Sequence, residues 1–381
     1  MIEYSEDLSK QIMLLAERND PSAVRMKRML SMPDLARKTN SPIFYIADVV
    51  KNCSALKSGD EVIFPEIVSV ANNFDLLGAD NNHPSRLPTD TFYIDTSHVL
   101  RTQTTVMWSY YLTDKTVIQR LHDEGMVLAY SYGKVYRNDE IDRNHYPVFH
   151  QIDGLCVSHR SKKQFSREDL TGILIDITKS IFGSSVSYRV SDDTFPFTVN
   201  SLQLEILWNG EWIEVLGSGL VNPKVLFLLG LQQEEYNGWA FGFGLDRLAK
   251  IKMNIPDIRI LWSDDDRITR QFKSINSTYC EVSKYPPVAR DISFIAEATL
   301  ALNRFYELVR DCGFHQNEDI IEEVVLLEKF ANDSKFGVGR VSYSFRINYR
   351  SRVRTLTNDE INEVQENVRQ KVGLLLGGQL R

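Results

Sequence analysis

Cysteine is scarce in this sequence, and the few cysteines show no pairing pattern. The 381 residues contain four, which are widely separated and form no CxxC pair: Cys53, Cys156, Cys280 and Cys312. This spacing argues against a disulfide framework or a zinc site and indicates a reducing compartment. No apolar run approaches the length of a membrane span. The start of the chain is acidic and lacks the arginines of an organelle presequence. We therefore expect a soluble cytoplasmic protein without a membrane partner, or one of an organellar matrix if a presequence has been removed.

The sequence also lacks the commonest nucleotide-binding loops and any excess of positive charge. There is no GxGxxG after a strand pattern and no GxxxxGK[ST], which excludes the usual dinucleotide and P-loop sites. The net charge of −7 provides no general attraction for nucleic acid, so a polyanion would need a local basic patch. The length and the 43% hydrophobic content are sufficient for two or three domains with sizeable cores.

Hydrophobic periodicity predicts an α+β protein with a helical preface and a strand-rich central domain. Residues 1–40 have helical spacing that is broken at Pro21, and strand patterns dominate residues 41–272. We expect strands at 61–65, 91–94, 127–138, 148–157, 187–190, 203–208 and 211–216. The Asn209-Gly210 pair predicts a tight hairpin between the last two. Tight turns between neighbouring strands favour a mainly antiparallel sheet flanked by helices, not a doubly wound parallel sheet.

The last hundred residues predict a second domain. Residues 273–284 have the polar composition of a linker, and residues 285–381 follow a β-α-β-β-α-β order, which is the ferredoxin-like pattern. We expect Asn358 to cap the final helix, because Asp359 and Glu360 follow in its first turn.

The most informative stretch of the chain follows Tyr136 and reads RNDEIDRNHYPVFHQID. Side chains alternate across a strand, so Phe149, Gln151 and Asp153 share one face, where a ring beside an amide and a carboxylate suits a nucleotide base next to a small polar ligand. Arg137 and Asp139 share a face of the preceding strand, and arginine is the side chain best shaped for a phosphate. Taken alone, the stretch is also compatible with an ordinary hairpin that has a charged loop.

Two further segments carry possible binding residues. Gly238-Trp-Ala-Phe-Gly-Phe-Gly-Leu-Asp-Arg247 is a crowded strand that enters a helix, with Arg247 on the first helical turn. In the second segment, Phe195 and Phe197 alternate onto one face and could hold a flat apolar side chain. Taken alone, the first segment is also compatible with a Gly-rich strand that packs against backbone, with Arg247 in solvent, and a pair such as Phe195 and Phe197 is more often part of a hydrophobic core.

Together the three segments resemble the class II aminoacyl-tRNA synthetases, and among them the single-chain, organellar-type phenylalanyl-tRNA synthetases. The resemblance covers about residues 41–381 and rests on motifs in both domains. Pro65 and the run from Asn72 to His83-Pro-Ser-Arg resemble motif 1 and its sequel, Arg137…His145…Phe149-His-Gln151 resembles motif 2, and Gly242…Gly244-Leu-Asp-Arg247 resembles motif 3. Lys284-Tyr-Pro-Pro-Val and Arg354-Thr-Leu-Thr-Asn resemble the ferredoxin-fold anticodon-binding domain.

The resemblance implies a ligase that activates L-phenylalanine with ATP and Mg²⁺, transfers it to tRNA and acts as a monomer. The ATP site would contain Arg137, Asp139, His145, Phe149 and Arg247, of which both arginines and the histidine would be catalytic. Arg137 would stabilise the reacting α-phosphate, His145 would reach the outer phosphates, and Phe149 and Arg247 would clamp the adenine. A metal-ligating side chain is not identified.

The resemblance also implies an amino-acid site. It would contain Gln103, Thr105, Trp108, Gln151, Asp153, Phe195, Phe197 and Ala240. Gln151 would orient the amino acid, and the two phenylalanines would grip its ring above a pocket floor at Ala240.

Several residues depart from the family pattern, and they cluster around the expected substrate head group. Gln103, Thr105, Trp108, Asp153 and Val199 stand where the family usually has His, Ser, Gln, Glu and Glu. Either the shell has been repacked around phenylalanine, or the substrate has shifted to a modified aromatic amino acid. Two other functions therefore stay open: a paralogue that activates another aromatic acid in a biosynthetic pathway, and a non-catalytic tRNA-binding regulator.

A basic face is predicted in the C-terminal domain. Between residues 342 and 350 polar and apolar side chains alternate, which places Arg346 and Arg350 on one face. Arg352 and Arg354 extend this face if the chain stays extended. We expect these four arginines to bind tRNA.

Overall fold

The computed structural model describes residues 1–381 apart from 139–141, 282–284, 316–317 and 352. The chain forms two compact units, which are described separately. The first contains Met1–Arg137 and Val148–Tyr279, and the second contains Asn138–Pro147 and Cys280–Arg381. None of the helices in the described ranges has both the length and the apolar character needed to cross a membrane.

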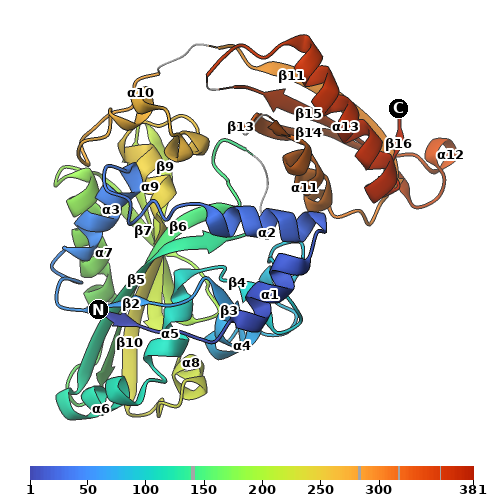
Figure 1. The fold of residues 1–381 in the computed structure, drawn as a ribbon. Helices are drawn as coiled ribbons and strands as arrows, with labels where there is room; N and C mark the ends of the chain where they lie inside the picture. The colour runs from blue at the N-terminus through green and yellow to red at the C-terminus, as the bar shows by residue number, and fades with distance from the viewer. Residues whose placement is uncertain (139–141, 282–284, 316–317, 352) are drawn as a thin grey trace. The chain divides into compact units, whose positions relative to one another are not determined.

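An eight-stranded sheet forms the centre of the first unit, in the order β1-β2-β5-β6-β10-β9-β8-β7 (Figure 1). The pairings from β5 to β7 are antiparallel, whereas β1–β2 and β2–β5 are parallel. The mainly antiparallel sheet predicted from the sequence is therefore confirmed. The strands of this unit, including the separate pair β3–β4, are β1 (Ile2–Glu3), β2 (Asp60–Ile63), β3 (Ile67–Ser69), β4 (His98–Leu100), β5 (Met126–Tyr136), β6 (Val148–His159), β7 (Tyr188–Asp192), β8 (Thr198–Trp208), β9 (Glu211–Val221) and β10 (Tyr236–Gly244).

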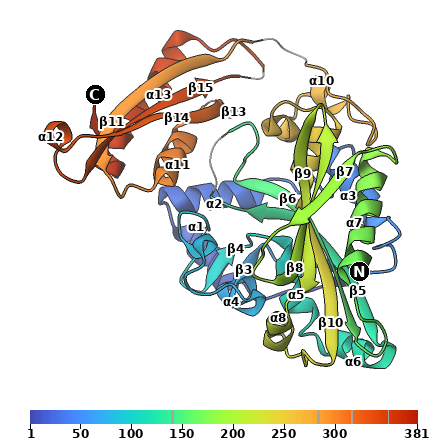
Figure 2. The same cartoon turned by 180° about the vertical axis from the view of Figure 1, so that it is seen from behind.

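Helices cover both faces of this sheet. Helix α3 packs against α7 and α9, which themselves pack on β9 and β6, so these three form one layer; all three are labelled in Figure 1, and Figure 2 shows α3 and α7 from behind. The α-helices are α1 (Ser9–Glu17), α2 (Pro21–Ser31), α3 (Pro42–Lys51), α4 (Val70–Asn73), α5 (Met107–Tyr111), α6 (Lys115–Glu124), α7 (Arg167–Phe182), α8 (Pro223–Leu228), α9 (Leu245–Lys252) and α10 (Asp266–Thr269). Short 3₁₀ turns occur at η1 (Asp75–Leu77), η2 (Pro84–Arg86), η3 (Thr104–Val106) and η4 (Ile258–Trp262).

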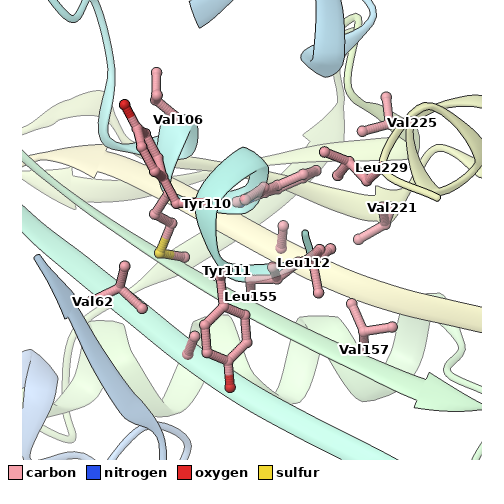
Figure 3. Packing of buried hydrophobic residues seen from close by; sticks show 14 of the residues in the cluster. Val62, Val106, Tyr110, Tyr111, Leu112, Leu155, Val157, Val221, Val225 and Leu229 are labelled. Atoms are coloured by element: carbon pink, nitrogen blue, oxygen red, sulfur yellow. The ribbon is translucent and has the colours of Figure 1, made fainter. Parts of the chain in front are cut away.

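The largest described core of this unit lies where α5 and α8 meet the sheet. Figure 3 shows Tyr111 and Leu112 beside Leu155 and Val157, the inward-facing residues of β6, with Val225 nearby. All of these side chains are buried, and burying such side chains contributes about 1.5–3 kcal/mol each. This packing anchors α5, and with it the turn that precedes α5, against the sheet.

The local expectations for this unit are mostly confirmed. Pro21 ends the first helical pattern and begins α2, whose N-cap Asp20 accepts a hydrogen bond from the Ala23 N–H. Asn209 and Gly210 have φ values of 51° and 88°, as a tight hairpin turn between β8 and β9 requires. The strand expected at 91–94 is wrong, because only Tyr93 makes an isolated bridge there.

The second unit has the ferredoxin-like order predicted from the sequence. Its four-stranded antiparallel sheet is ordered β14-β15-β11-β16, and α11 and α13 pack against each other. Phe294, Phe305 and Phe345 are fully buried in its core. Its elements are β11 (Val288–Glu297), α11 (Leu302–Cys312), β12 (Phe314–His315), β13 (Glu318–Asp319), β14 (Ile321–Ala331), α12 (Asp333–Phe336), β15 (Arg340–Tyr349), α13 (Asn358–Leu376) and β16 (Gln379–Leu380).

The N-cap expected for α13 is displaced by one residue. Thr357, not Asn358, has the extended backbone of an N-cap, and its side chain accepts a hydrogen bond from the Glu360 N–H. Glu360 in turn accepts from the Thr357 N–H at 2.9 Å, which completes a capping box. The expectation for Asn358 was wrong because Thr357 and Glu360 have the three-residue spacing that lets each side chain satisfy the other's backbone N–H.

Replacing Thr357 by alanine should therefore loosen α13. We expect the first turn of the helix to lose about 1 kcal/mol of protection, because the cap hydrogen bond disappears. Hydrogen–deuterium exchange of the α13 amides, followed by mass spectrometry, measures this loss. Asn358→Ala is the matched control, and an equal effect in both variants would contradict the assignment of Thr357 as the cap.

Candidate active site

Small residues line one face of the sheet where four strands meet. Residues paired across antiparallel strands lie on the same face. Asp153 of β6 pairs with Ser131 of β5 and with Gly242 of β10, and Gly242 pairs with Gly217 of β9. A Cβ atom on Gly242 would lie 2.7 Å from Asp153 Oδ1, and one on Gly217 would lie 2.7 Å from Phe195 Cζ. The side chains of Asp153 and Phe195 therefore lie directly over these two glycines.

Asp153 is buried, and hydroxyl groups bind both of its carboxyl oxygens. Thr105 Oγ1 donates to Oδ1 at 2.6 Å, and Thr104 Oγ1 donates to Oδ2. Burial raises the pKa of Asp153 to about 6, while the hydrogen bonds from both threonines and the charge of Arg137 act in the opposite direction. Each oxygen of a carboxylate has room for a second hydrogen bond. The group is thus held in place and still has acceptor capacity for a ligand.

The segment that supplies these threonines is fixed from several sides. Arg101 is buried and donates to the backbone oxygens of Phe64 at 2.8 Å and Lys134 at 2.7 Å. The Thr102 N–H donates to Asn73 Oδ1, and Asn73 Nδ2 donates back to Thr102 Oγ1, both at 3.0 Å. The sequence pattern did not single out Arg101, Thr102 or Asn73 as supports of the site, because each acts through contacts distant in sequence.

Three aromatic rings lie beside the glycine row. The rings of Phe195 and Phe197 are nearly parallel, with centroids 6.0 Å apart, and Trp108 meets Phe197 edge-on at 5.9 Å. Phe195 and Phe197 stand in the turn before β8, not in a strand as their alternation suggested. Trp108 and Ala240 belong to the buried cluster against which Phe197 packs. The structure therefore brings together the three residues expected around the aromatic side chain, Phe195, Phe197 and Ala240, with Trp108, which was expected near the substrate head group.

The structure brings together only some of the residues expected to bind ATP. The Arg137 guanidinium lies over the Phe149 ring, 5.2 Å from its centroid, and Arg137 Nε donates to the Thr102 backbone oxygen at 3.1 Å. Arg137 follows β5 instead of lying within it, because that strand ends at Tyr136. Arg247 is exposed on the first turn of α9, as expected. Asp139 lies outside the described residues.

His145 belongs to the second unit. Its Nδ1 atom lies 2.8 Å from Asp142 Oδ1, and its backbone N–H donates to the same oxygen at 2.7 Å. Its assignment to the outer phosphates stays a prediction.

A buried histidine supports the aromatic platform from the opposite face of β6. His150 Nε2 accepts a hydrogen bond from the Leu35 N–H at 3.0 Å, so the ring proton resides on Nδ1, 3.2 Å from Asp246 Oδ2. The His150 backbone N–H also donates to Asp246 Oδ2 at 2.6 Å. His150 lies on β6 and Asp246 on α9, so their hydrogen bonds hold these two elements together. The neighbouring residues in sequence, Phe149 and Arg247, are thereby positioned relative to each other. Sequence reasoning missed this pair, although His150 lies within the stretch that it singled out.

Not all of the remaining residues expected around the substrate head group lie beside Asp153. Gln151 Oε1 accepts from the Thr104 N–H at 3.3 Å, and Gln103 is half-buried at the start of the same turn. Val199, which the family pattern placed near the head group, is 37% exposed on β8. Thr104, which no motif singled out, binds Asp153 instead. The two adjacent threonines at 104 and 105 were the only signal for this role in the sequence.

The arginines expected to bind tRNA are already engaged with carboxylates. Arg346 is exposed and forms a two-pronged pair with Asp291, with both N–O distances 2.8 Å. Arg350 lies 3.2 Å from the buried Glu322, and Arg354 lies 2.6 Å from Glu360. Arg352 lies outside the described residues. The expected basic face is thus a mixed-charge face, because acidic side chains of β11, β14 and α13 pair with these arginines.

No group of three or more His, Cys, Asp or Glu side chains in the described ranges is arranged to hold a metal ion. Magnesium is commonly bound by one or two carboxylates together with substrate phosphates, so a nucleotide-dependent metal does not require such a group.

Comparison with known proteins assigns both parts of the chain to families. A model of the class II core domain of tRNA synthetases, type F, matches residues 31–272, and a model of the ferredoxin-fold anticodon-binding domain matches residues 283–381.

Three similar proteins are phenylalanine–tRNA ligases. The chain is 38% identical over 325 residues to the chloroplastic/mitochondrial ligase of Arabidopsis thaliana, covering 83% of this chain and 71% of that protein. It is 34% identical to the mitochondrial ligase of Dictyostelium discoideum (84% and 78% covered) and 35% identical to that of Mus musculus (82% and 73% covered).

Removing the charge of Asp153 should stabilise the first unit at alkaline pH. The pKa of Asp153, about 6, lies above the ordinary value of 3.8, so the stabilising contribution of this group is lost as the pH rises through about 6. Because each pH unit of difference corresponds to about 1.4 kcal/mol, burying the charged form costs about 3 kcal/mol. We expect Asp153→Asn to raise the free energy of unfolding at pH 8, with a difference that shrinks towards pH 5.

Urea unfolding followed by tryptophan fluorescence measures this effect in the first unit alone, since all five tryptophans belong to it. Asp264→Asn is the control, because the Asp264 side chain is 95% exposed. A variant that is less stable than the parent at pH 8, by the same amount as at pH 5, would show that the charge of Asp153 is not costly.

Proposed function

This chain belongs to the phenylalanine–tRNA ligases of the class II aminoacyl-tRNA synthetases, and we propose that it binds L-phenylalanine on the glycine-lined face of β6, β10 and β9 and activates it with ATP beside Phe149. It is a ligase that forms an aminoacyl-tRNA. The observation that carries the site assignment is the Arg137–Phe149 stack, because it sets a guanidinium and an aromatic face beside the buried Asp153 carboxyl.

The reaction requires two displacements. A carboxylate oxygen of phenylalanine attacks the α-phosphorus of ATP and releases pyrophosphate, and a ribose hydroxyl of tRNA then attacks the carbonyl carbon of the adenylate and releases AMP. Neither step needs a side-chain nucleophile, so the protein contributes positioning and charge stabilisation. Class II synthetases generally use Mg²⁺, which would neutralise the charge that develops on the phosphates of ATP.

The contacts of the site support a division of roles. Arg137 is held by the Thr102 backbone oxygen, so its guanidinium is already ordered when a phosphate arrives. Asp153 offers acceptors to the substrate ammonium, since each oxygen is used by only one threonine hydroxyl. Phe195, Phe197 and Ala240 provide apolar surface for the phenyl ring, and Arg247 would cover the adenine.

The second unit supports tRNA as the partner, because its match is an anticodon-binding domain. We propose that Arg346 and its neighbours on β15 contact the tRNA backbone. A monomeric state is likewise a proposal. The relatives from Arabidopsis and mouse are named as organellar enzymes, so an organellar matrix agrees with the comparisons, and the cytoplasmic location expected from the sequence stays a prediction.

Phenylalanine-dependent ATP–pyrophosphate exchange tests the proposed reaction directly. Arg137→Ala should lower its rate about 10²- to 10³-fold, because removing one well-placed donor costs about 3–4 kcal/mol of transition-state stabilisation. Arg189→Ala is a matched control, since Arg189 also stacks on a ring, 4.6 Å from the centroid of Trp212 on β9. Exchange at the parent rate in Arg137→Ala would remove this arginine from the active site.

The proposed tRNA contact has its own test. Arg346→Ala should raise the KM for tRNA. It should also lower the slope of log binding constant against log salt concentration by about one, because one phosphate contact is lost. Pyrophosphate exchange, which uses no tRNA, should stay unchanged. Arg346 is preferred to Arg350 because loss of Arg350 would remove a cationic partner from the buried Glu322.

Asp291→Asn supplies the opposite change. It removes the carboxylate paired with Arg346 and should strengthen tRNA binding. If both substitutions leave the KM for tRNA unaltered, this face does not contact tRNA.

A further inference from the structure

Trp108 has a buried hydrogen-bond donor without an acceptor. Its side chain is 1% exposed, and no acceptor within the described part of the chain lies within bonding distance of the indole Nε1. Leaving a buried donor unsatisfied costs about 1–3 kcal/mol. Aromatic packing at this position does not require an N–H group, so packing alone does not account for a buried donor that lacks an acceptor.

The position of Trp108 connects the two halves of the site. Trp108 follows Thr104 and Thr105 by four and three residues in a continuous helical turn, so the three side chains share one face. Both threonines bind Asp153, whereas the Trp108 ring meets Phe197 edge-on. Trp108 therefore lies between the carboxyl group and the phenylalanine pair.

A second series of contacts leads from Phe197 back to Asp153 along the glycine-lined face of the sheet. Phe197 stacks on Phe195, Phe195 lies over Gly217, Gly217 pairs with Gly242, and Asp153 lies over Gly242. The result is a closed ring of contacting residues in which glycines supply the floor. The ring therefore includes both the acceptors of Asp153 and the residue with the unsatisfied donor, Trp108.

We propose that Trp108 is a specificity-determining residue, whose indole N–H donates a hydrogen bond to an oxygen atom of the bound aromatic amino acid. The inference rests on the proposed function and deepens it. A hydrogen-bond donor beside an otherwise aromatic wall favours ligands that carry a matching acceptor and disfavours ligands that leave it unpaired. The acceptor is either a carboxyl oxygen, present in every amino acid, or a hydroxyl on the aromatic ring.

Two replacements of Trp108 test the proposal in the full-length protein. Trp108→Phe removes the N–H and part of the ring, whereas β-(3-benzothienyl)alanine at position 108 keeps the bicyclic shape and removes only the N–H. Trp212→Phe is the control, because Trp212 is 39% exposed on β9. For each protein, kcat/KM in ATP–pyrophosphate exchange is measured with phenylalanine and with tyrosine, together with the KM for ATP.

We expect both replacements to lower kcat/KM about 10-fold or more, because an oxygen of the substrate loses its partner, while the KM for ATP stays unchanged. An equal loss for phenylalanine and tyrosine assigns the acceptor to the carboxyl group, and a loss confined to tyrosine assigns it to the ring hydroxyl. Parent-like activity of the benzothienylalanine protein would overturn the proposal, because shape alone would then explain Trp108. A parallel rise in the KM for ATP would do the same, by showing a structural effect.

A binding measurement separates this inference from the proposed function. The indole N–H resonance of Trp108 is identified by its absence from the ¹H–¹⁵N spectrum of Trp108→Phe. We expect it to move on addition of phenylalanine or tyrosine without ATP. An unmoved resonance at saturating amino acid would refute the role of Trp108, whereas a parent protein that binds the amino acid but does not catalyse exchange would refute the proposed reaction alone.

Discussion

The register between β6 and β10 is the constraint on which the site depends. The pairing runs without interruption from Tyr236 opposite His159 to Gly244 opposite Gln151. This register sets Asp153 beside Gly242, where the missing side chain leaves room for the carboxyl group. A slip of one residue would turn Asp153 to the other face of the sheet and bring His150 into the site. The burial of Leu155 and Val157 under α5 on the same face opposes such a slip, because the slip would remove both side chains from this core.

The two faces of β6 have different roles: one carries the residues proposed to bind the ligand, and the other holds the strand in place. One face carries Phe149, Gln151 and Asp153, which contact Arg137, Thr104 and Thr105. The other carries His150, which ties the strand to the Asp246 carboxyl of α9 and to the Leu35 N–H. Because β6 is bound from both sides, the side chains facing the ligand need little reorganisation when it arrives, which is the condition for effective charge stabilisation.

The residues that depart from the family pattern act together and not as separate substitutions. Thr105 and Asp153, which stand where serine and glutamate are usual, form a direct hydrogen bond, and Thr104 occupies the other carboxyl oxygen. A shorter acidic side chain is thus held close to its own strand, within reach of the two hydroxyls. Trp108 follows on the same helical turn, so Asp153, Thr105 and Trp108 form one continuous wall from the carboxyl group to Phe197. Val199 stands apart, exposed on β8.

The sequence by itself determined the fold class, the order of elements in both parts and the family, because strand alternation, helical spacing and turn residues such as Asn209-Gly210 act over a few neighbours. It also identified most of the residues around Asp153. It was wrong about the strand at 91–94, where only Tyr93 makes a bridge, and about the cap of the last helix, which is Thr357 because of its local spacing to Glu360. It also did not reveal that Asp291 and Glu322, distant in sequence, pair with two of the arginines expected to bind tRNA. Only the tertiary structure decided that Thr104 and Thr105 bind Asp153, that His150 pairs with Asp246 and that the Trp108 N–H lacks an acceptor within the described residues. These facts depend on the register of strands far apart in the chain, which local periodicity does not encode.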